Sequence, residues 1–183
     1  MKIDSITFIT GNAAKAEQLG RHLNYPVSHK RLDLPEIQSL NLREIVERKA
    51  KDAYEIIGSP VLVEDVSLTF HALGKLPGPF IKWFLGELGN GGLCKMLDGQ
   101  KNRNATAEVW FGLYDGKELK IFNGKVEGKI AARPRGKTDF GWDPIFIPKG
   151  SRKTWAEMTP EEQKKTSMRR IALKKLEKFL KTI

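Results

Sequence analysis

The chain has 183 residues, of which 40% are hydrophobic and 30% are charged, and its formal net charge is +10. This composition is typical of a globular protein and excludes a disordered chain, while the apolar runs are too short for a membrane span. The single cysteine, Cys94, excludes an internal disulfide and a cysteine-ligated zinc site. Because no apolar signal segment opens the sequence, we expect one soluble, cytoplasmic domain over residues 1–183.

The positive charge is concentrated near the C-terminus. Residues 149–183 contain eleven Lys and Arg but only four Asp and Glu. Such an excess indicates a polyanionic partner, either nucleic acid or a phosphorylated small molecule, but a solvated basic helix would produce it as well.

Strand-like and helix-like segments alternate in the first part of the chain. β-Branched and aromatic residues predict the strands, while apolar spacing and end signals, such as Asn41 followed by Glu44, predict the helices. The predicted elements are a strand at 5–10, a helix at 13–23, a strand at 27–32, a helix at 42–57 and a strand at 61–70.

The later part adds a hairpin and further helices. Asp115-Gly116 indicates a hairpin turn, and Thr159 followed by Pro160 and Glu162 indicates a helix start. The predicted elements are a rigid turn at 76–79, amphipathic stretches at 80–88 and 91–97, strands at 105–114, 118–122, 124–132 and 145–147, and one helix from 160 to near 183. This order predicts an α/β fold with a mixed sheet.

The first candidate site is the turn Thr10-Gly11-Asn12-Ala13-Ala14-Lys15, where a predicted strand ends and a helix begins. Free N–H groups at a helix start bind phosphate, and Lys15 adds a positive charge in the first turn. Neither the P-loop pattern nor the dinucleotide-binding pattern is present, so an ordinary strand–helix turn stays an alternative.

Two adjacent acids interrupt the apolar strand predicted at 61–70. Because side chains alternate along a strand, Glu64 and Asp65 face opposite sides, both of which are otherwise apolar. A buried carboxylate needs a cation, a hydrogen-bond network or a cleft, so either a hard metal such as Mg²⁺ or a salt bridge would explain them. Glu36, after Leu34-Pro35, is a further candidate carboxylate.

Two other features combine polar and apolar groups. Lys49 lies at the centre of the apolar stripe of the helix predicted at 42–57, where it either snorkels past the core edge or reaches an anion. Phe140-Gly141-Trp142-Asp143 offers aromatic surface on which a base can stack and a carboxylate that can accept from base N–H groups. A structural turn, or aromatic residues that belong to the core, would also explain this segment.

Taken together, these stretches resemble the Ham1-type inosine triphosphate pyrophosphatase family. The resemblance implies a two-lobed α/β fold with a long mixed sheet, a cleft between the lobes, and a homodimer. It also implies Mg²⁺-dependent hydrolysis of inosine, deoxyinosine and xanthosine triphosphates to the monophosphate and pyrophosphate, which cleans the nucleotide pool. The ordered motifs that carry it are Thr10-Gly11-Asn12…Lys15, Asp33-Leu34-Pro35-Glu36, Val63-Glu64-Asp65, Leu76-Pro77-Gly78-Pro79, Pro134-Arg135-Gly136, Phe140-Gly141-Trp142-Asp143-Pro144 and Ser167…Arg169.

The same resemblance implies a role for each matching residue. Asp65 would be the catalytic base for the attacking water and, with Glu36, a metal ligand. The implied substrate-binding residues are Thr10, Gly11, Asn12, Lys15 and Lys49 at the phosphates, Phe140, Gly141, Trp142, Asp143 and Arg169 at the base, and Lys164 near the C-terminus.

Three positions depart from the family pattern. Gln18 stands where the family has Glu, and Gln163 stands where it has Lys, a role that the adjacent Lys164 would take over. Met168 stands where the family has His, and a thioether cannot donate a hydrogen bond to a purine 6-oxo group. Either base discrimination is weaker or altered here while the phosphate chemistry persists, or Met168 is an apolar helix residue and Arg169 suffices.

Two other functions stay open. A basic nucleic-acid-binding module would explain the charged C-terminal part but gives Glu64-Asp65 no purpose. A related pyrophosphatase that acts on modified pyrimidine nucleotides would use the same phosphate chemistry.

Overall fold

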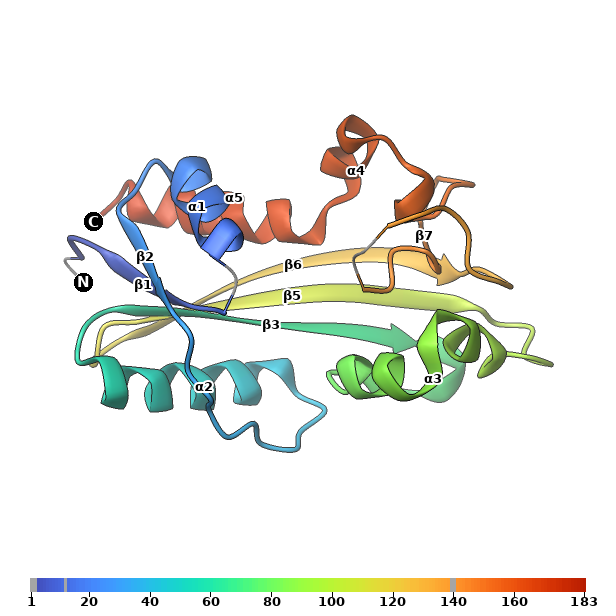
Figure 1. Ribbon diagram of the computed structural model, residues 1–183, viewed down its shortest axis with the longest axis horizontal. Helices are drawn as coiled ribbons and strands as arrows, with labels where there is room; N and C mark the ends of the chain where they lie inside the picture. Colours follow the sequence, from blue (N-terminus) through green and yellow to red (C-terminus); the bar gives the residue numbers. More distant parts are fainter. Residues whose placement is uncertain (1–2, 12, 139–140) are drawn as a thin grey trace. The chain divides into compact units, whose positions relative to one another are not determined.

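The computed structural model describes residues 3–11, 13–138 and 141–183 (Figure 1). Within these residues, seven strands form one mixed sheet in the order β2-β1-β3-β5-β6-β7, with β4 paired to β3. The strands are β1 (Ile6–Ile9), β2 (Val27–Lys30), β3 (Val61–Phe70), β4 (Pro77–Gly78), β5 (Asn104–Tyr114), β6 (Leu119–Ile130) and β7 (Phe146–Pro148). The helices are α1 (Ala13–Leu23), α2 (Leu42–Ile57), α3 (Ile81–Lys95), α4 (Pro160–Thr166) and α5 (Met168–Leu180).

Both strand directions occur in the sheet. β1 pairs in parallel with β2 and β3, whereas β4 pairs antiparallel with β3, and β7 pairs antiparallel with β6. The mixed α/β class predicted from the sequence is therefore confirmed. The chain divides into two compact units: the first contains residues 1–65, 109–124 and 169–183, and the second contains residues 66–108 and 125–168.

In the first unit, helices cover both faces of the strands. α2 lies on one face, while α1 and α5 lie on the other (Figure 1). The α2 face is apolar because Val46, Ala50 and Ala53 pack with Val61 and Val63 of β3. These side chains are completely buried, so the position of α2 on the strand is fixed by its own core.

The ends of α2 are set by local signals. The Asn41 side chain accepts a hydrogen bond from the Arg43 N–H at 3.0 Å, and its amide donates to Glu44 at 3.1 Å. At the other end, Gly58 adopts φ 70° and its N–H donates to the Tyr54 carbonyl at 2.8 Å. This left-handed conformation favours glycine and ends the helix. The caps hold Lys49 in the middle of the helix.

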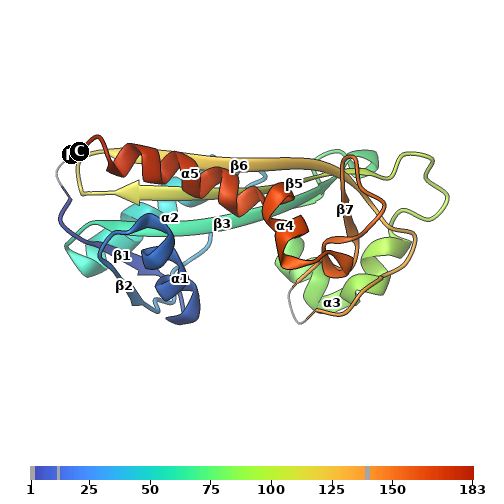
Figure 2. The same cartoon turned by 90° about the horizontal axis from the view of Figure 1, so that it is seen from above.

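α5 packs along the first unit's part of β6 (Figure 2). The rings of Phe122 and Phe179 lie 5.5 Å apart, and the Lys175 ammonium donates to the Asn123 carbonyl at 2.6 Å. These contacts fix the helix whose first turn carries Arg169.

The second unit has its own core. It contains Phe70, Ile81, Phe146 and Trp155, and the rings of Phe146 and Trp155 lie 4.4 Å apart. β7 joins this core through antiparallel pairing with residues 128–130 of β6.

Several elements differ from the sequence prediction. β6 is one strand of 12 residues, where two strands at 118–122 and 124–132 were expected. The expected helix from 160 to near 183 is broken at Ser167, whose backbone is extended (φ −78°, ψ 116°), so it forms α4 and α5. Pro77–Gly78 of the expected turn pairs with β3. The two amphipathic stretches at 80–88 and 91–97 correspond to α3, which is interrupted by Gly89 at φ 63°.

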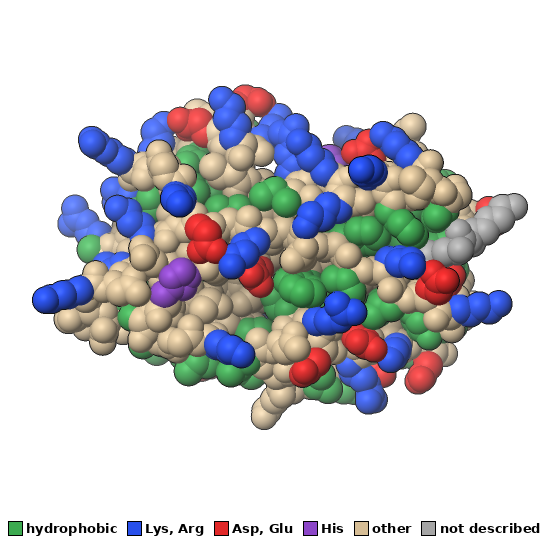
Figure 3. Space-filling model, turned by 180° about the vertical axis from the view of Figure 1, so that it is seen from behind, with side chains coloured by type: hydrophobic (Ala, Val, Ile, Leu, Met, Phe, Trp, Pro, Cys, Tyr) green, Lys and Arg blue, Asp and Glu red, His purple; other side chains and the backbone are tan. Residues whose placement is uncertain are grey.

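The chain has a net charge of +10, and the face drawn in Figure 3 carries many Lys and Arg side chains with acidic side chains between them. Among the described residues, no helix has both the length and the apolar character needed to cross a membrane.

Candidate functional site

The centre of the candidate site is the acid pair on β3. Glu64 and Asp65 are adjacent on an extended strand, so their side chains leave on opposite faces. Their side chains are 12% and 16% exposed, which means that each charge requires a partner. Both acids belong to the first unit, and each meets cations from the helices on its own face.

Glu64 pairs with the cations of α1 and α5. Its Oε1 accepts from Arg169 Nη2 at 2.5 Å and lies 3.9 Å from the Lys15 ammonium. Arg169 also lies over the Phe111 ring, with its guanidinium carbon 5.8 Å from the centroid, which adds a cation–π contact. Glu64 Oε2 is buried and has no hydrogen-bond partner among the described residues. The carboxylate thus holds two cations and retains one oxygen for a ligand.

Lys15 is an unusual lysine. Burial lowers its pKa, the Glu64 carboxylate opposes this change, and the Arg169 charge lowers the pKa further. A bound phosphate would offset both the burial and the repulsion, because an adjacent anion favours the charged ammonium. Lys15 lies in the first turn of α1, where the helix dipole also attracts anions.

On the opposite face, Lys49 links Asp65 to Glu36. Its ammonium lies 3.2 Å from Asp65 Oδ2 and 3.1 Å from Glu36 Oε1, and it also donates to the Glu64 carbonyl at 3.4 Å. Burial alone would lower the pKa of Lys49, but the carboxylates of Asp65 and Glu36 outweigh it and raise the pKa. Lys49 is therefore a cation held between carboxylates, not a lysine that snorkels into solvent.

The position of the Lys49 ammonium shows that two carboxylates converge on one cation-sized point. Hard carboxylate oxygens suit Mg²⁺, which needs only one or two protein carboxylates when water and phosphate complete its coordination. Within the described part of the chain, no cluster of three or more His, Cys, Asp or Glu could hold a metal by itself. Glu36 and Asp65 therefore fit a metal that is held jointly with a phosphate ligand.

The predicted phosphate turn precedes α1. The Thr10 N–H donates to the Lys30 carbonyl at 3.0 Å, which fixes the end of β1. A Cβ added to Gly11 would lie 3.3 Å from the Arg31 side chain, so glycine leaves room for that arginine beside the turn. Asn12 lies outside the described residues.

The predicted base-binding segment belongs to the second unit. Gly141 has φ 50°, and its carbonyl accepts from Asn90 Nδ2 at 3.1 Å. Trp142 is buried in the core of this unit, yet its Nε1 has no hydrogen-bond partner among the described residues. Burial raises the pKa of the Asp143 carboxyl to about 6. The segment thus combines an unused indole donor with a carboxyl that titrates near neutral pH; Phe140 lies outside the described residues.

The positions that depart from the family pattern also belong to the second unit, apart from Gln18, whose side chain lies outside the described part. Gln163 donates to the Trp155 carbonyl at 2.6 Å, so it has a structural role. Lys164 is exposed and pairs with Glu161 at 2.6 Å. Met168 packs against the apolar core of the unit, which favours the interpretation of this residue as an apolar helix residue.

Of the two explanations given for Glu64 and Asp65, the structure shows the salt bridges. Each acid makes salt bridges, and together these bridges join three carboxylates to three cations from separate segments of the first unit. The sequence analysis did not include Glu64 among the catalytic, metal-binding or substrate-binding residues, although strand alternation already indicated that it must find a partner on the face opposite Asp65. The carboxylate that pairs with Lys15 in the structure is Glu64, at 3.9 Å.

Comparison with known proteins identifies the family of the chain. The model of the Ham1 family matches residues 6–179. The chain belongs to the Ham1 family. It is 46% identical over 180 residues to the inosine triphosphate pyrophosphatase of Emericella nidulans, with 96% of each chain covered.

Solved structures of Ham1 proteins share the fold. A HAM1 protein from Coxiella burnetii gives a TM-score of 0.86 at 27% identity, over 98% of this chain and 99% of that chain. A nucleoside-triphosphatase / dITP/XTP pyrophosphatase from Mycobacterium abscessus gives a TM-score of 0.79 at 28% identity, over 94% of this chain and 98% of that chain. The family resemblance predicted from the motifs is confirmed.

Proposed function

We propose that the protein is a nucleoside triphosphate pyrophosphatase that hydrolyses inosine triphosphate and related deaminated purine nucleotides to the monophosphate and pyrophosphate. The observation that carries this proposal is the cluster of three carboxylates and three cations around Glu64 and Asp65. The Ham1 family match and the curated relatives named inosine triphosphate pyrophosphatase support the same activity. Since the family match spans both units, we treat residues 1–183 as one functional domain.

The charges of the cluster support a Mg²⁺ cofactor. Lys15, Lys49 and Arg169 balance Glu36, Glu64 and Asp65, so the cluster alone has no formal net charge with which to attract a triphosphate. Glu36 and Asp65 would hold a divalent cation, which would make the cluster positive and would supply Lewis-acid stabilisation of the phosphates.

The residues of the first unit then have distinct tasks. Lys15 and Lys49 bind the phosphate oxygens and support the charge that develops on the pyrophosphate leaving group. Asp65 orients the attacking water and takes its proton. Glu64 keeps Arg169 and Lys15 in place, because its Oε1 contacts both.

Base recognition is assigned to residues 140–143. At neutral pH the Asp143 carboxyl, with its pKa of about 6, is largely ionised and accepts a hydrogen bond from the N1–H of a 6-oxopurine. Adenine presents an acceptor at N1, so an ionised carboxylate disfavours it. This difference would select deaminated purines over adenosine triphosphate.

The decisive experiment is a nucleotide panel with added Mg²⁺ and identification of the products. We expect inosine triphosphate to give inosine monophosphate and pyrophosphate, and Asp65→Asn to remove this activity. Formation of the diphosphate and phosphate would contradict the proposal. A faster reaction with modified pyrimidine nucleotides would instead identify the alternative substrate class. Two further predictions, a homodimer and a cytoplasmic location, are checked by light scattering and by cell fractionation.

A further inference from the structure

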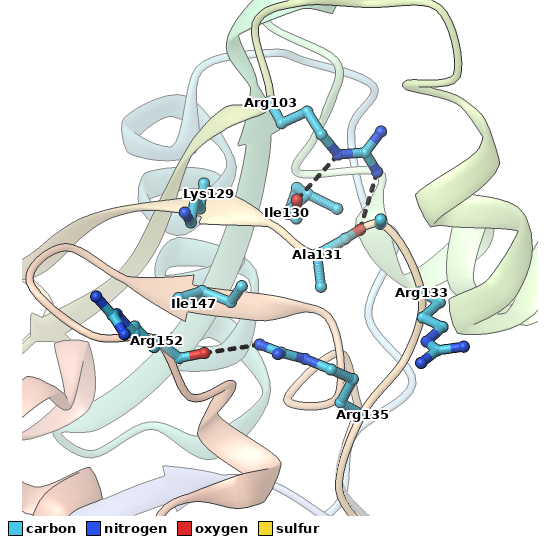
Figure 4. Close-up of a pocket in the computed structure, with 9 residues that line it drawn as sticks. Arg103, Lys129, Ile130, Ala131, Arg133, Arg135, Ile147 and Arg152 are labelled. Carbon is cyan, nitrogen blue, oxygen red and sulfur yellow. Dashed lines mark hydrogen bonds between the residues drawn. The ribbon is translucent and has the colours of Figure 1, made fainter.

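A second cationic site lies in the second unit, and none of its lining residues is among those assigned to the reaction. It is a pocket of about 440 Å³, shown in Figure 4 and called here the basic pocket. Its walls include Ile130 and Ile147, and none of its lining residues is acidic. Five of the nine lining residues are cationic: Arg103, Lys129, Arg133, Arg135 and Arg152.

Two of these arginines build the pocket. Arg103 donates to four backbone carbonyls, those of Cys94, Leu97, Ile130 and Ala131, at 2.9–3.0 Å. Arg103 therefore joins the end of α3 to the end of β6, and its donors are largely used.

Only some of the hydrogen-bond donors of Arg135 have a partner. Its Nη2 donates to the Arg152 carbonyl at 2.8 Å and lies 3.4 Å from Glu157 Oε2. Its Nε, however, is buried and has no hydrogen-bond partner among the described residues. A buried donor without an acceptor is costly, so Arg135 brings an unsatisfied donor as well as a positive charge to the lining of the pocket.

The three other cations, Lys129, Arg133 and Arg152, are exposed. Within the described part of the chain, no Asp or Glu lies within 4.0 Å of their charged groups. They come from β6, from the loop after it and from the loop after β7, and Figure 4 shows them around one opening. Like charges around a concave, partly apolar surface focus a positive potential, which an anion would relieve.

We propose that the basic pocket binds a small multivalent phosphoanion, such as inorganic pyrophosphate. Guanidinium groups match pairs of phosphate oxygens, and three uncompensated cations suit an anion with several negative charges. A single-stranded nucleic acid is disfavoured because the lining contains no aromatic side chain on which a base could stack. Because the basic pocket shares no residue with the cluster around Glu64 and Asp65, binding here and hydrolysis can succeed or fail separately.

The test is a titration of the full-length protein with pyrophosphate without Mg²⁺, followed by amide NMR. Site-resolved resonances separate this pocket from the Lys15 region, which also attracts phosphate. We expect saturable shifts at residues 129–133 and at Arg152. The double variant Arg133→Ala/Arg152→Ala should weaken this binding by about tenfold or more while leaving the shifts near Lys15 unchanged. The Arg152 carbonyl that Arg135 uses is kept in this variant.

The matched control is Lys101→Ala/Lys178→Ala, which removes two exposed charges outside the basic pocket. It should change the affinity by less than about twofold. Three results would overturn the proposal: no saturable shifts at residues 129–133, equal weakening in the control, or shifts produced equally by sulfate. Tighter binding of a single-stranded oligonucleotide than of pyrophosphate at the same resonances would also overturn it, in favour of nucleic acid.

Discussion

The buried carboxyl of Asp143, which we assign to base recognition, should lower the stability of the protein when it is ionised. Burial raises the pKa of Asp143 from 3.8 to about 6. At 1.36 kcal/mol per pKa unit, this difference corresponds to an upper limit of about 3 kcal/mol for holding the ionised form in the folded chain. Because solvent reaches part of the side chain, we expect about 1–2 kcal/mol.

The direction of the effect follows from proton binding. A raised folded-state pKa means that the folded chain binds the proton more tightly than the unfolded chain. The stabilisation of the folded chain by the protonated Asp143 carboxyl is therefore complete below about pH 3.8. It is lost as the pH rises through about 6. Asp143→Asn is neutral at every pH and should therefore stabilise the protein near neutral pH, by roughly 2–8 °C in Tm for a chain of this size. The gain should shrink as the pH falls through about 6.

Calorimetry at several pH values measures the Tm of Asp143→Asn and of the wild type. Steady-state kinetics measures the activity that the substitution removes. The same variant should lose kcat/KM for inosine triphosphate, and the wild-type kcat/KM should fall as acid protonates Asp143 near pH 6. Asp98→Asn removes an exposed acidic charge from the same unit and controls for the change in net charge. An Asp143→Asn variant that is no more stable than the wild type above pH 7 would refute the reasoning.

Other substitutions test the cluster of the first unit and the base preference. Asp65→Asn should reduce kcat to below about a tenth of wild type while the circular dichroism spectrum stays the same; activity above this level would reject Asp65 as the base. Lys15→Ala should chiefly raise KM for the triphosphate, and an unchanged KM would count against the phosphate turn. Lys49→Met leaves Glu36 and Asp65 without their shared cation, so Mg²⁺ alone should raise its Tm more than that of wild type; an equal Mg²⁺ effect would argue against a metal at these carboxylates. Met168→His adds a side chain that can donate to a purine 6-oxo group and should increase the ratio of kcat/KM for inosine over adenosine triphosphate; a wild-type ratio already above about a thousand would refute weakened base discrimination.

Local signals predicted most of the first unit. Helix α2 begins and ends where Asn41 and Gly58 indicate, and β3 has the predicted bounds, because capping and alternating apolar residues act over a few neighbours. The break between α4 and α5 was not predictable in the same way. The helical apolar pattern continues across Ser167, whereas the hydrogen bond from Trp155 Nε1 to Thr166 at 2.9 Å joins residues eleven apart.

The candidate site was predicted by residue type but not by partner. The sequence identified Lys15, Lys49 and Asp65 separately, yet nothing in their spacing shows which carboxylate each lysine reaches. These pairs depend on the faces that α1 and α2 cover, which is a property of the tertiary fold. The same holds for Arg135. The sequence shows the motif that contains it, but only the structure shows that its Nε is buried without a hydrogen-bond partner among the described residues.

The order of two residues on β3 explains how the cluster is assembled. Consecutive side chains on a strand face opposite sides, so Glu64 and Asp65 give one acid to each layer of helices. Each acid then gathers the cations of its own layer: Arg169 and Lys15 at Glu64, and Lys49 at Asp65. An acid pair spaced two residues apart would place both charges on one face and leave the other layer's cations without a carboxylate. Adjacency, not the mere presence of two acids, therefore allows separate helices to bring their charges to one short segment of strand.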